Sequence, residues 1–495
     1  MTENDFQALA RAGYNRIPLQ LETFADLDTP LSIYLKLANR PGSYLLESVI
    51  GGERFGRYSI VGLPAREHIE VRGHAVAVRR DGKVLESAEH DDPLARIDEY
   101  LKGFRAAPLQ SSLRFAGGVA GYFGYDTVRY IERRVARNTK PDPIGLPEIR
   151  LLLSDELAVV DNLSGKLHLI VYVDPAEANA YADGHKRLQQ LRAALRERAN
   201  IPAHEAVGVV PEARSNIGED AFFAAVARAK RYITDGDIMQ VQVSQRLTQP
   251  FAHSPLNLYR ALRSINPSPY MFYFDFGDCQ LVGASPEILV RREGDKVTQR
   301  PIAGTRKRGA TPQKDAAMEH ELVNDPKERA EHLMLIDLGR NDVGRIAHIG
   351  SVKVTETMVV ERYSHVMHMV SNVEGQVDAK LTPMELLRAT FPAGTVTGTP
   401  KVRAMEIIDE LETERRSVYA GAAGYIGFNG NVDLAIAIRT GIVKDRKLHV
   451  QAAAGIVADS IPESEWLETK NKARALLAAA EMVHAGIDTP LQPGA

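Results

Sequence analysis

Alternating polar and apolar positions predict most of the strands in this chain. The run DIMQVQVSQRL at 237–247 places Val241 and Val243 on one face of an extended segment and Gln240 and Gln242 on the other. Successive strand residues point to opposite sides of a sheet, so residues two apart share a face. The run therefore predicts a strand with one apolar face and one face that carries amides.

Asn429-Gly430, between two alternating runs, is the short pattern most typical of a β-hairpin. The second run, at 431–443, would place Arg439 on the same face as Ala435 and Ala437. These small neighbours leave space above the sheet for a bound molecule, whose carboxylate Arg439 would hold through two parallel hydrogen bonds. An arginine on an exposed sheet face fits the same pattern equally well.

Two helical patterns begin at a proline and carry carboxylates on the edge of an apolar face. They start at Pro326 and Pro462, in PKERAEHLMLIDLGRND and PESEWLETKNKARALL. The i, i+3 pairs are Glu328 with Glu331 and Glu465 with Glu468, the latter followed by Lys472. Glutamates in a first turn favour the helix dipole, and most such faces are simply solvated. Two matching pairs of oxygen ligands nevertheless point to one shared Mg²⁺.

The order of the elements predicts an α+β fold. Strands such as LVGASPEILVRR at 281–292 outnumber helices, which favours large, mainly antiparallel sheets covered by helices. Residues 199–216 are rich in Ala, Pro and Val and lack periodicity. They divide the chain into an N-terminal α+β region, 15–200, and a C-terminal region, 217–485, which holds the candidate chemistry.

Composition narrows the possible function classes. With 61 basic and 64 acidic residues among 495, and a net charge of -3, no charge excess favours nucleic acid or a membrane surface as partner. The N-terminus is acidic where a signal peptide is basic, and no apolar run approaches the ~20 residues of a membrane span, which predicts a cytoplasmic protein. Cys279 is the single cysteine, so an intrachain disulfide and a cysteine-rich metal site are excluded.

Three further features have two interpretations each. His368 lies in an alternating run, where a histidine is more often structural than catalytic. Ala453, Ala454 and Gly455 would let backbone amides approach an anion, although tight packing explains their small size as well. The loop AGTVTGTPK at 393–401 fails the spacing of a phosphate-binding loop, so it predicts only a connection into a helix near Pro400.

Seven motifs in order across about 217–475 resemble those of the chorismate-utilising enzyme family. They are GASPEILVR, RPIAGTRKRG, EHLMLIDLGRND, TFPAGTVTGTPK, YAGAAGYIGF, AIAIRT and AAAGIVADSIPESEWLETKNKA. The N-terminal segment YLLESVIGGERFGRYSIVG is similar to the tryptophan-binding segment of the anthranilate-forming branch, so the resemblance covers nearly the whole chain. It implies large sheets packed face to face and covered by helices.

The resemblance implies a role for each conspicuous side chain. Glu331 and Glu468, with Glu328 and Glu465 close by, would hold a Mg²⁺ that binds the ring carboxylate of chorismate. Glu287 would be the general acid for the departing C4 hydroxyl, in a catalytic pocket that His368 and Thr395 also line. The substrate contacts would be Gly304, Thr305, Tyr419, Arg439, the backbone of Ala453, Ala454 and Gly455, and Lys472, which also balances the carboxylates.

Two positions favour the anthranilate-forming branch of the family. Water-adding relatives carry a lysine base at the place of Gln240, and many aminodeoxychorismate synthases carry a nucleophilic lysine at the place of Ala303. The resemblance therefore implies a large subunit that converts chorismate and ammonia to anthranilate and pyruvate, the first step of tryptophan biosynthesis. An aminodeoxychorismate synthase component and a catalytically silent tryptophan-sensing subunit remain as alternatives.

The source of nitrogen implies a partner protein. Cys279, in FGDCQLVG at an expected hairpin turn, lacks the tight turn and the histidine of a glutamine-hydrolysing site. Ammonia would therefore come from glutamine through a separate amidotransferase subunit. The resemblance implies a heterotetramer of two large and two small subunits.

By the same resemblance, L-tryptophan would inhibit from a site distinct from the chorismate pocket. The site would consist of Glu47, Ser48, Pro269, Tyr270 and Met271. Glu47 would hold the ammonium group, Ser48 would add a hydrogen bond, and Tyr270 and Met271 would cover the indole ring. Ordinary strand and surface positions explain the same residues if the motif is set aside.

Overall fold

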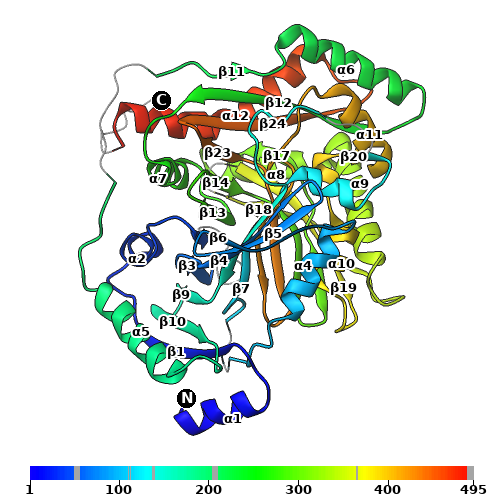
Figure 1. The fold of residues 1–495 in the computed structure, drawn as a ribbon. Coiled ribbons are helices and arrows are strands. Elements are labelled where there is room, and N and C mark those ends of the chain that lie inside the picture. The colour runs from blue at the N-terminus through cyan, green and yellow to red at the C-terminus, as the bar shows by residue number, and fades with distance from the viewer. Residues whose placement is uncertain are drawn as a thin grey trace.

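The fold is built from two large antiparallel sheets and the helices that cover them (Figure 1). The structure, a computed structural model, describes residues 1–48, 56–109, 111, 113–135, 140–202, 210–363 and 366–487. Each sheet has 12 strands in this part of the chain. The predicted α+β architecture is confirmed.

The first sheet consists, in spatial order, of β1 (Ile17–Phe24), β10 (Lys166–Val173), β9 (Glu156–Asp161), β3 (Tyr58–Gly62), β2 (Ser43–Glu47), β13 (Tyr270–Asp275), β14 (Gln280–Ser285), β23 (Thr440–Lys444), β24 (Lys447–Ile456), β12 (Gln240–Pro250) and β11 (Arg214–Ser215), with β20 (Gly398–Thr399) paired to β12. The second consists of β17 (Ile302–Lys307), β19 (Val366–Gln376), β16 (Lys296–Gln299), β15 (Ile288–Glu293), β22 (Val432–Ile436), β21 (Ala422–Gly427), β7 (Gly118–Phe123), β8 (Ile149–Ser154), β4 (Glu67–Arg72), β5 (Ala75–Arg80) and β6 (Lys83–Glu89), with β18 (Lys353–Arg362) paired to β19.

The helices of the described residues are α1 (Glu3–Arg11), α2 (Pro30–Leu37), α4 (Pro93–Lys102), α5 (Ala180–Ala194), α6 (Glu219–Thr234), α7 (Pro255–Ile265), α8 (Pro312–Asn324), α9 (Pro326–Gly344), α10 (Pro383–Thr390), α11 (Lys401–Leu411) and α12 (Pro462–Ala485), with 3₁₀ turns η1 (Tyr125–Tyr130) and η3 (Gly394–Val396). None of them is long and apolar enough to cross a membrane.

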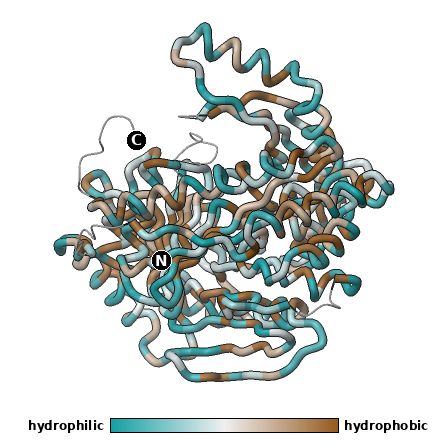
Figure 2. The backbone as a smooth tube through the Cα atoms, turned by 90° about the horizontal axis from the view of Figure 1, so that it is seen from above, coloured by the Kyte–Doolittle hydropathy of each residue, from teal (hydrophilic) through white to brown (hydrophobic). Residues whose placement is uncertain are grey.

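Side chains from both sheets meet in one apolar layer, so the sheets pack face to face as expected. Tyr44 and Ile60 of the first sheet share this layer with Ala120 and Tyr122 of the second. Helices α2, α5, α7 and α12 bury their apolar faces against the outer side of the first sheet. Hydrophobic segments accordingly concentrate inside the molecule and hydrophilic ones at its periphery (Figure 2). Burying each large apolar side chain contributes about 1.5–3 kcal/mol.

The two proline-initiated helices form where the sequence predicts them. Pro326 begins α9, and the Asp325 side chain caps it by accepting the N–H groups of Lys327 at 2.9 Å and Glu328 at 3.2 Å. Pro462 likewise begins α12. A proline at the first position costs no hydrogen bond, because the first N–H groups of a helix have no partner within it. Both carboxylate pairs therefore lie in the first two turns of a helix.

The structure corrects the prediction of one strand over 431–443. The strand ends at Ile436, and after Arg439 the chain continues as β23 in the other sheet. Arg439 has φ 48°, a left-handed conformation that is uncommon outside glycine and persists where the surrounding structure fixes it. The run at 281–292 divides in the same way, into β14 and β15 of different sheets.

Strands from the two predicted regions are joined in both sheets. β2 of the N-terminal region pairs with β13 of the C-terminal region, and β7 pairs with β21. Of the predicted connection at 199–216, residues 203–209 lie outside the described residues. The boundary between the regions stays a prediction.

Candidate active site

Glu287 and Arg439 lie where the chain crosses from one sheet to the other. Glu287 separates β14 from β15, and Arg439 separates β22 from β23. β14 pairs with β23 and β15 pairs with β22, so the two crossings run side by side. The Ala284 N–H donates to the Arg439 carbonyl at 3.1 Å, and the Ile436 N–H donates to the Glu287 carbonyl at 3.0 Å. Backbone pairing therefore brings an acid and a cation to one place.

The environment of this pair favours proton donation and anion binding. Burial raises the pKa of the Glu287 carboxyl to about 8, and the Thr395 side chain and Arg439 oppose this only in part. The carboxyl is therefore protonated at neutral pH. Burial lowers the pKa of Arg439, whose guanidinium has no hydrogen bond or ion pair with any residue in the described ranges. A buried cation without a partner is costly, so the site suits an incoming carboxylate.

His368 on β19 presents a neutral ring to the same region. Its Nδ1 lies 3.2 Å from the Gly304 carbonyl oxygen and 3.0 Å from Thr305 Oγ1. Burial, and then Arg439, lower the pKa of His368 to about 4, so the ring is neutral at pH 7. A carbonyl can only accept, which places the ring proton on Nδ1 and leaves Nε2 as an acceptor.

Gly304 is required by its surroundings. Its φ is 70°, and a Cβ there would lie 2.8 Å from Leu322 Cδ1. Any other residue would be strained and would displace the carbonyl that orients His368. The glycine thus fixes the histidine rather than lining the pocket.

One cavity of about 200 Å³ brings most of the predicted site residues together. Those that line it are Glu287, Thr305, Glu331, His368, Thr395, Tyr419, Arg439, Ala453 and Lys472. Ala454 does not line the cavity and lies in the apolar core. Gln240 and Gln242 also line the cavity, and Gly455 lies beside their amide groups. The fold therefore brings most of these predicted residues to one cavity, although not every neighbour of a lining residue faces it.

The predicted metal-binding carboxylates have unequal surroundings. Arg306 binds Glu328 at 2.9 Å, and Lys472 binds Glu468 at 2.7 Å and donates to the Ala453 carbonyl at 3.0 Å. Glu331 has no hydrogen bond or ion pair to any described residue. Burial raises the pKa of Glu331, as do Glu328 and Glu468, while Lys472 opposes them.

These carboxylates fit a hard cation that binds together with its substrate. Within the described residues, no group of three or more His, Cys, Asp and Glu side chains is arranged to hold a metal by itself. Mg²⁺ needs only one or two protein carboxylates when water and substrate oxygens complete its shell. A partly buried, unpaired carboxylate such as Glu331, beside a second one at Glu468, meets that need.

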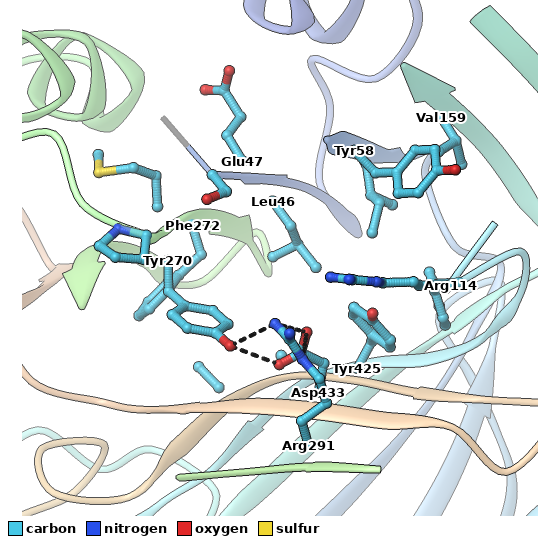
Figure 3. A pocket seen from close by; sticks show the side chains of 17 residues that line it. Leu46, Glu47, Tyr58, Arg114, Val159, Tyr270, Phe272, Arg291, Tyr425 and Asp433 are labelled. Carbon is cyan, nitrogen blue, oxygen red and sulfur yellow. Dashed lines mark hydrogen bonds and ion pairs between the residues drawn. The ribbon is translucent and has the colours of Figure 1, made fainter. Parts of the chain in front are cut away.

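A second cavity gathers all five residues predicted to bind tryptophan. Glu47, Ser48, Pro269, Tyr270 and Met271 line it. Its floor holds a buried network in which Tyr270 donates to Asp433 at 3.1 Å and Arg291 donates to Asp433 at 3.0 Å (Figure 3). Asp433 and Arg291 had no signal in the sequence, because each occupies an ordinary strand position.

Glu47 does not present its carboxylate as the sequence interpretation assumed. Tyr259 donates to it at 2.5 Å and Arg263 at 3.1 Å, both from α7. The side chain points away from Tyr270, Arg291 and Asp433 (Figure 3). Neighbouring positions on β2 alternate, so Leu46 faces the cavity where Glu47 does not. The residue borders the cavity, yet its charge is already neutralised.

Arg416 is a positioning residue that the sequence did not reveal. Its fully buried guanidinium binds Glu412 at 2.6 Å and donates to the carbonyls of Val396 at 2.8 Å and Gln242 at 2.9 Å. It also lies 5.7 Å from the centre of the Tyr419 ring. It thus ties together three walls of the first cavity. In the sequence it is one charge in the run ETERRS, which resembles a solvated loop.

Comparison with known proteins identifies the family of this chain. A family model described as chorismate binding enzyme matches residues 51–478. The chain belongs to the chorismate-binding enzyme family. Anthranilate synthase component 1 of Neisseria meningitidis serogroup A is 56% identical over 99% of this chain and 100% of its own length. The same component of Pseudomonas aeruginosa is 54% identical over 99% and 100%. Within this family, the chain is an enzyme of the anthranilate synthase component 1 type.

Solved structures of family members share the fold. Anthranilate synthase component I from Streptococcus pneumoniae aligns with a TM-score of 0.76 at 38% identity, covering 92% of this chain and 99% of that one. The menaquinone-specific isochorismate synthase from Escherichia coli aligns with a TM-score of 0.71 at 18% identity, over 96% and 99%. At that identity the second match speaks for the fold alone.

Proposed function

We propose that this chorismate-binding enzyme converts chorismate and ammonia to anthranilate and pyruvate, with Mg²⁺ bound by Glu331 and Glu468. The observation that carries the proposal is one cavity that holds an unpaired Arg439, an unpaired Glu331 and a protonated Glu287. Chorismate offers two carboxylates and a ring hydroxyl, which are the groups that such a cavity would bind and protonate.

Each residue then has a defined task. Arg439 binds one carboxylate of chorismate. Glu287 gives its proton to the C4 hydroxyl, which leaves as water while ammonia adds at C2. The ring then loses its C2 proton and releases the C3 enolpyruvyl group, which takes up a proton to become pyruvate. When bound, Mg²⁺ supplies positive charge that neutralises the ring carboxylate.

The surroundings of Ala303 argue against an aminodeoxychorismate synthase. Its methyl group lines the cavity, and it offers no nucleophile for covalent attack on the ring. A silent tryptophan-sensing subunit would have no need for a protonated Glu287 facing an unpaired Arg439. Both features favour a working site that adds ammonia at C2.

The proposal is tested by supplying the purified chain with chorismate, Mg²⁺ and ammonium at alkaline pH and following anthranilate fluorescence. We expect product with ammonium and none with glutamine, because Cys279 is buried and burial raises the pKa of its thiol to about 12. Glutamine should become a substrate only after a separate amidotransferase subunit is added, in an assembly that we propose contains two subunits of each kind. A folded protein without fluorescent product would refute the proposed function.

We further propose that L-tryptophan binds the second cavity and inhibits. The two cavities share two strands: β15 joins Glu287 to Arg291, and β22 joins Asp433 to the Arg439 crossing. A ligand can inhibit through these strands only if it binds one of their arrangements more tightly than the other. Such coupling typically changes the affinity for the second ligand by about 5- to 150-fold. Tryptophan and chorismate should then weaken each other's binding by the same factor.

Replacing Ser48 with phenylalanine should abolish inhibition while nearly sparing activity without tryptophan. The larger ring would fill the cavity that Ser48 lines, at a distance from the catalytic residues. Inhibition curves for the parent and the variant provide the measurement, and Ser87→Phe, on the exposed strand β6, provides the control. A Ser48→Phe enzyme that stays as sensitive as the parent would show that the ligand binds elsewhere.

A further inference from the structure

A small cavity, here named the rear cavity, shares a wall with the first cavity. Glu287, Leu335 and Thr395 line both of them, so these three residues separate the two spaces. The rear cavity has a volume of about 30 Å³, which is enough for about two water molecules. Glu287 can therefore be reached from a side that a substrate in the first cavity does not occupy.

Gln299 of β16 brings a buried, unsatisfied acceptor to the rear cavity. The residue is 6% exposed and lines the cavity. Its Nε2 donates to the Leu289 carbonyl at 3.1 Å, and a carbonyl can only accept, so this bond fixes which end of the amide is the oxygen. No described residue donates to that Oε1. Buried polar atoms are almost always satisfied, so the oxygen indicates a donor inside the cavity.

Gly339 gives independent evidence that this space is needed. It lies inside α9, where alanine is favoured over glycine, and it also lines the rear cavity. A Cβ there would make only ordinary contacts, at 3.4 Å to Gln299 Oε1, 3.5 Å to Val373 Cγ2 and 3.7 Å to Pro301 Cγ. Neighbouring atoms therefore do not explain the glycine. Room for a molecule beside Gln299 Oε1 does.

The charged groups around the rear cavity are already paired. Asp342 accepts a hydrogen bond from Lys401 at 2.7 Å, and Arg300 donates to Glu361 at 2.8 Å. Both Asp342 and Arg300 line the cavity, and neither calls for a further ion. The cavity therefore suits a small neutral molecule that donates a hydrogen bond, and water is such a molecule.

We propose that the rear cavity binds water that returns a proton to Glu287 after each turnover, a role that rests on the proposed function. Glu287 gives its proton to the C4 hydroxyl and must regain one before the next reaction. One O–H bond of the water breaks as its proton joins the carboxylate. The same oxygen receives a proton that comes from solvent, so the water is regenerated. Gln299 is a positioning residue, because it accepts a hydrogen bond from the water and orients it.

The role of the rear cavity is tested with Gly339→Ala, which fills space beside Gln299 Oε1 and removes no hydrogen bond. We expect kcat to fall by about tenfold, which is part of the roughly 100- to 10,000-fold that a general acid contributes. The ratio of kcat in H₂O to kcat in D₂O should rise, because return of the proton becomes slow. KM for chorismate and for ammonia should stay near the parent values. The thermal unfolding midpoint should rise, because alanine favours the helix.

Gly344→Ala is the matched control on the same helix. Gly344 does not line the rear cavity, and a Cβ there would meet nothing within 4 Å. The control should raise the midpoint and keep both the kcat and the isotope effect of the parent. Gln299→Leu is a second test variant, which keeps the size of the side chain but removes the acceptor. It should lower kcat and raise the isotope effect as Gly339→Ala does.

Three results would overturn the role of the rear cavity. The first is a parental kcat and isotope effect in both test variants. The second is a lower kcat with an unchanged isotope effect, which would show only a packing defect. The third is a higher KM for ammonia with kcat unchanged, which would assign the cavity to the nucleophile. A parent protein that makes no anthranilate refutes the proposed function itself, which these variants cannot mimic.

Discussion

Replacing Glu287 with glutamine is expected to lower kcat for anthranilate formation by about 100- to 10,000-fold, the usual contribution of a general acid. Glutamine keeps the shape of the side chain but has no proton to give to the C4 hydroxyl. Glu287 is 7% exposed and lies between β14 and β15, where a neutral amide fits the buried surroundings. Stopped assays with saturating chorismate and ammonium measure the loss. A Glu287→Gln enzyme with parental kcat would remove this residue from the mechanism.

The pH dependence gives an independent check of the same residue. Because the pKa of Glu287 is raised to about 8, the carboxyl loses its proton as pH rises through 8. The reaction rate, divided by the concentration of neutral ammonia, should therefore fall over that range. Stability should change as well. The ordinary pKa of a glutamate carboxyl is 4.5. Between pH 4.5 and pH 8 the folded state therefore binds more protons than the unfolded state, so the free energy of unfolding falls as pH rises. Glu287→Gln should lack this decrease, and its thermal midpoint should exceed that of the parent most clearly above pH 8.

The sequence predicts local structure well wherever one pattern lies within one element. Pro326 and Pro462 begin helices as expected, and Asn429-Gly430 forms the expected turn between β21 and β22, with Gly430 at φ 79°. Helix starts and tight turns depend on a few neighbouring residues, which a sequence displays directly. The carboxylate pairs of α9 and α12 could therefore be placed on helices before any tertiary contact was known.

The crossings between the sheets could not be predicted in this way. The run at 431–443 alternates throughout, although Arg439 separates strands of different sheets. The position of the break depends on the pairing of β22 with β15 and of β23 with β14, and these partners lie more than a hundred residues earlier. Alternation reports which residues share a face but not which sheet they join. Glu287 and Arg439, the acid and the cation of the candidate active site, both lie at such breaks.

Motif resemblance located residues whose surroundings it could not describe. It placed Glu47 at the same cavity as the other residues predicted to bind tryptophan, but the carboxylate binds Tyr259 and Arg263 of α7. It also gave no indication that Arg416 supports the first cavity from behind, because a buried arginine inside a charged run resembles a solvated one in the sequence. In both cases the surroundings of the side chain depend on hydrogen-bond partners that lie far away in the sequence.

Removing one of the two proposed metal-binding charges should have the second large effect. Glu331→Gln and Glu468→Gln should each lower activity at limiting Mg²⁺ by more than about 100-fold, since each loses a charged ligand and keeps its size. Glu463→Gln is the matched control, because Glu463 is an exposed glutamate in the first turn of α12. It should retain the activity of the parent. Full activity of both test variants at low Mg²⁺ would make the pairs ordinary solvated helix faces.

Thermal unfolding separates loss of the metal site from loss of the fold. Mg²⁺ that binds only the folded state should raise the midpoint of the parent and of Glu463→Gln, but not that of Glu331→Gln. Without Mg²⁺, Glu331→Gln should unfold at a higher temperature than the parent, because it removes a partly buried charge that Glu328 and Glu468 repel. The raised pKa of Glu331 also means that protons compete with Mg²⁺, so the midpoint gain of the parent should shrink as pH falls. If Mg²⁺ raises the unfolding midpoint equally in Glu331→Gln and in the parent, the ion binds away from α9.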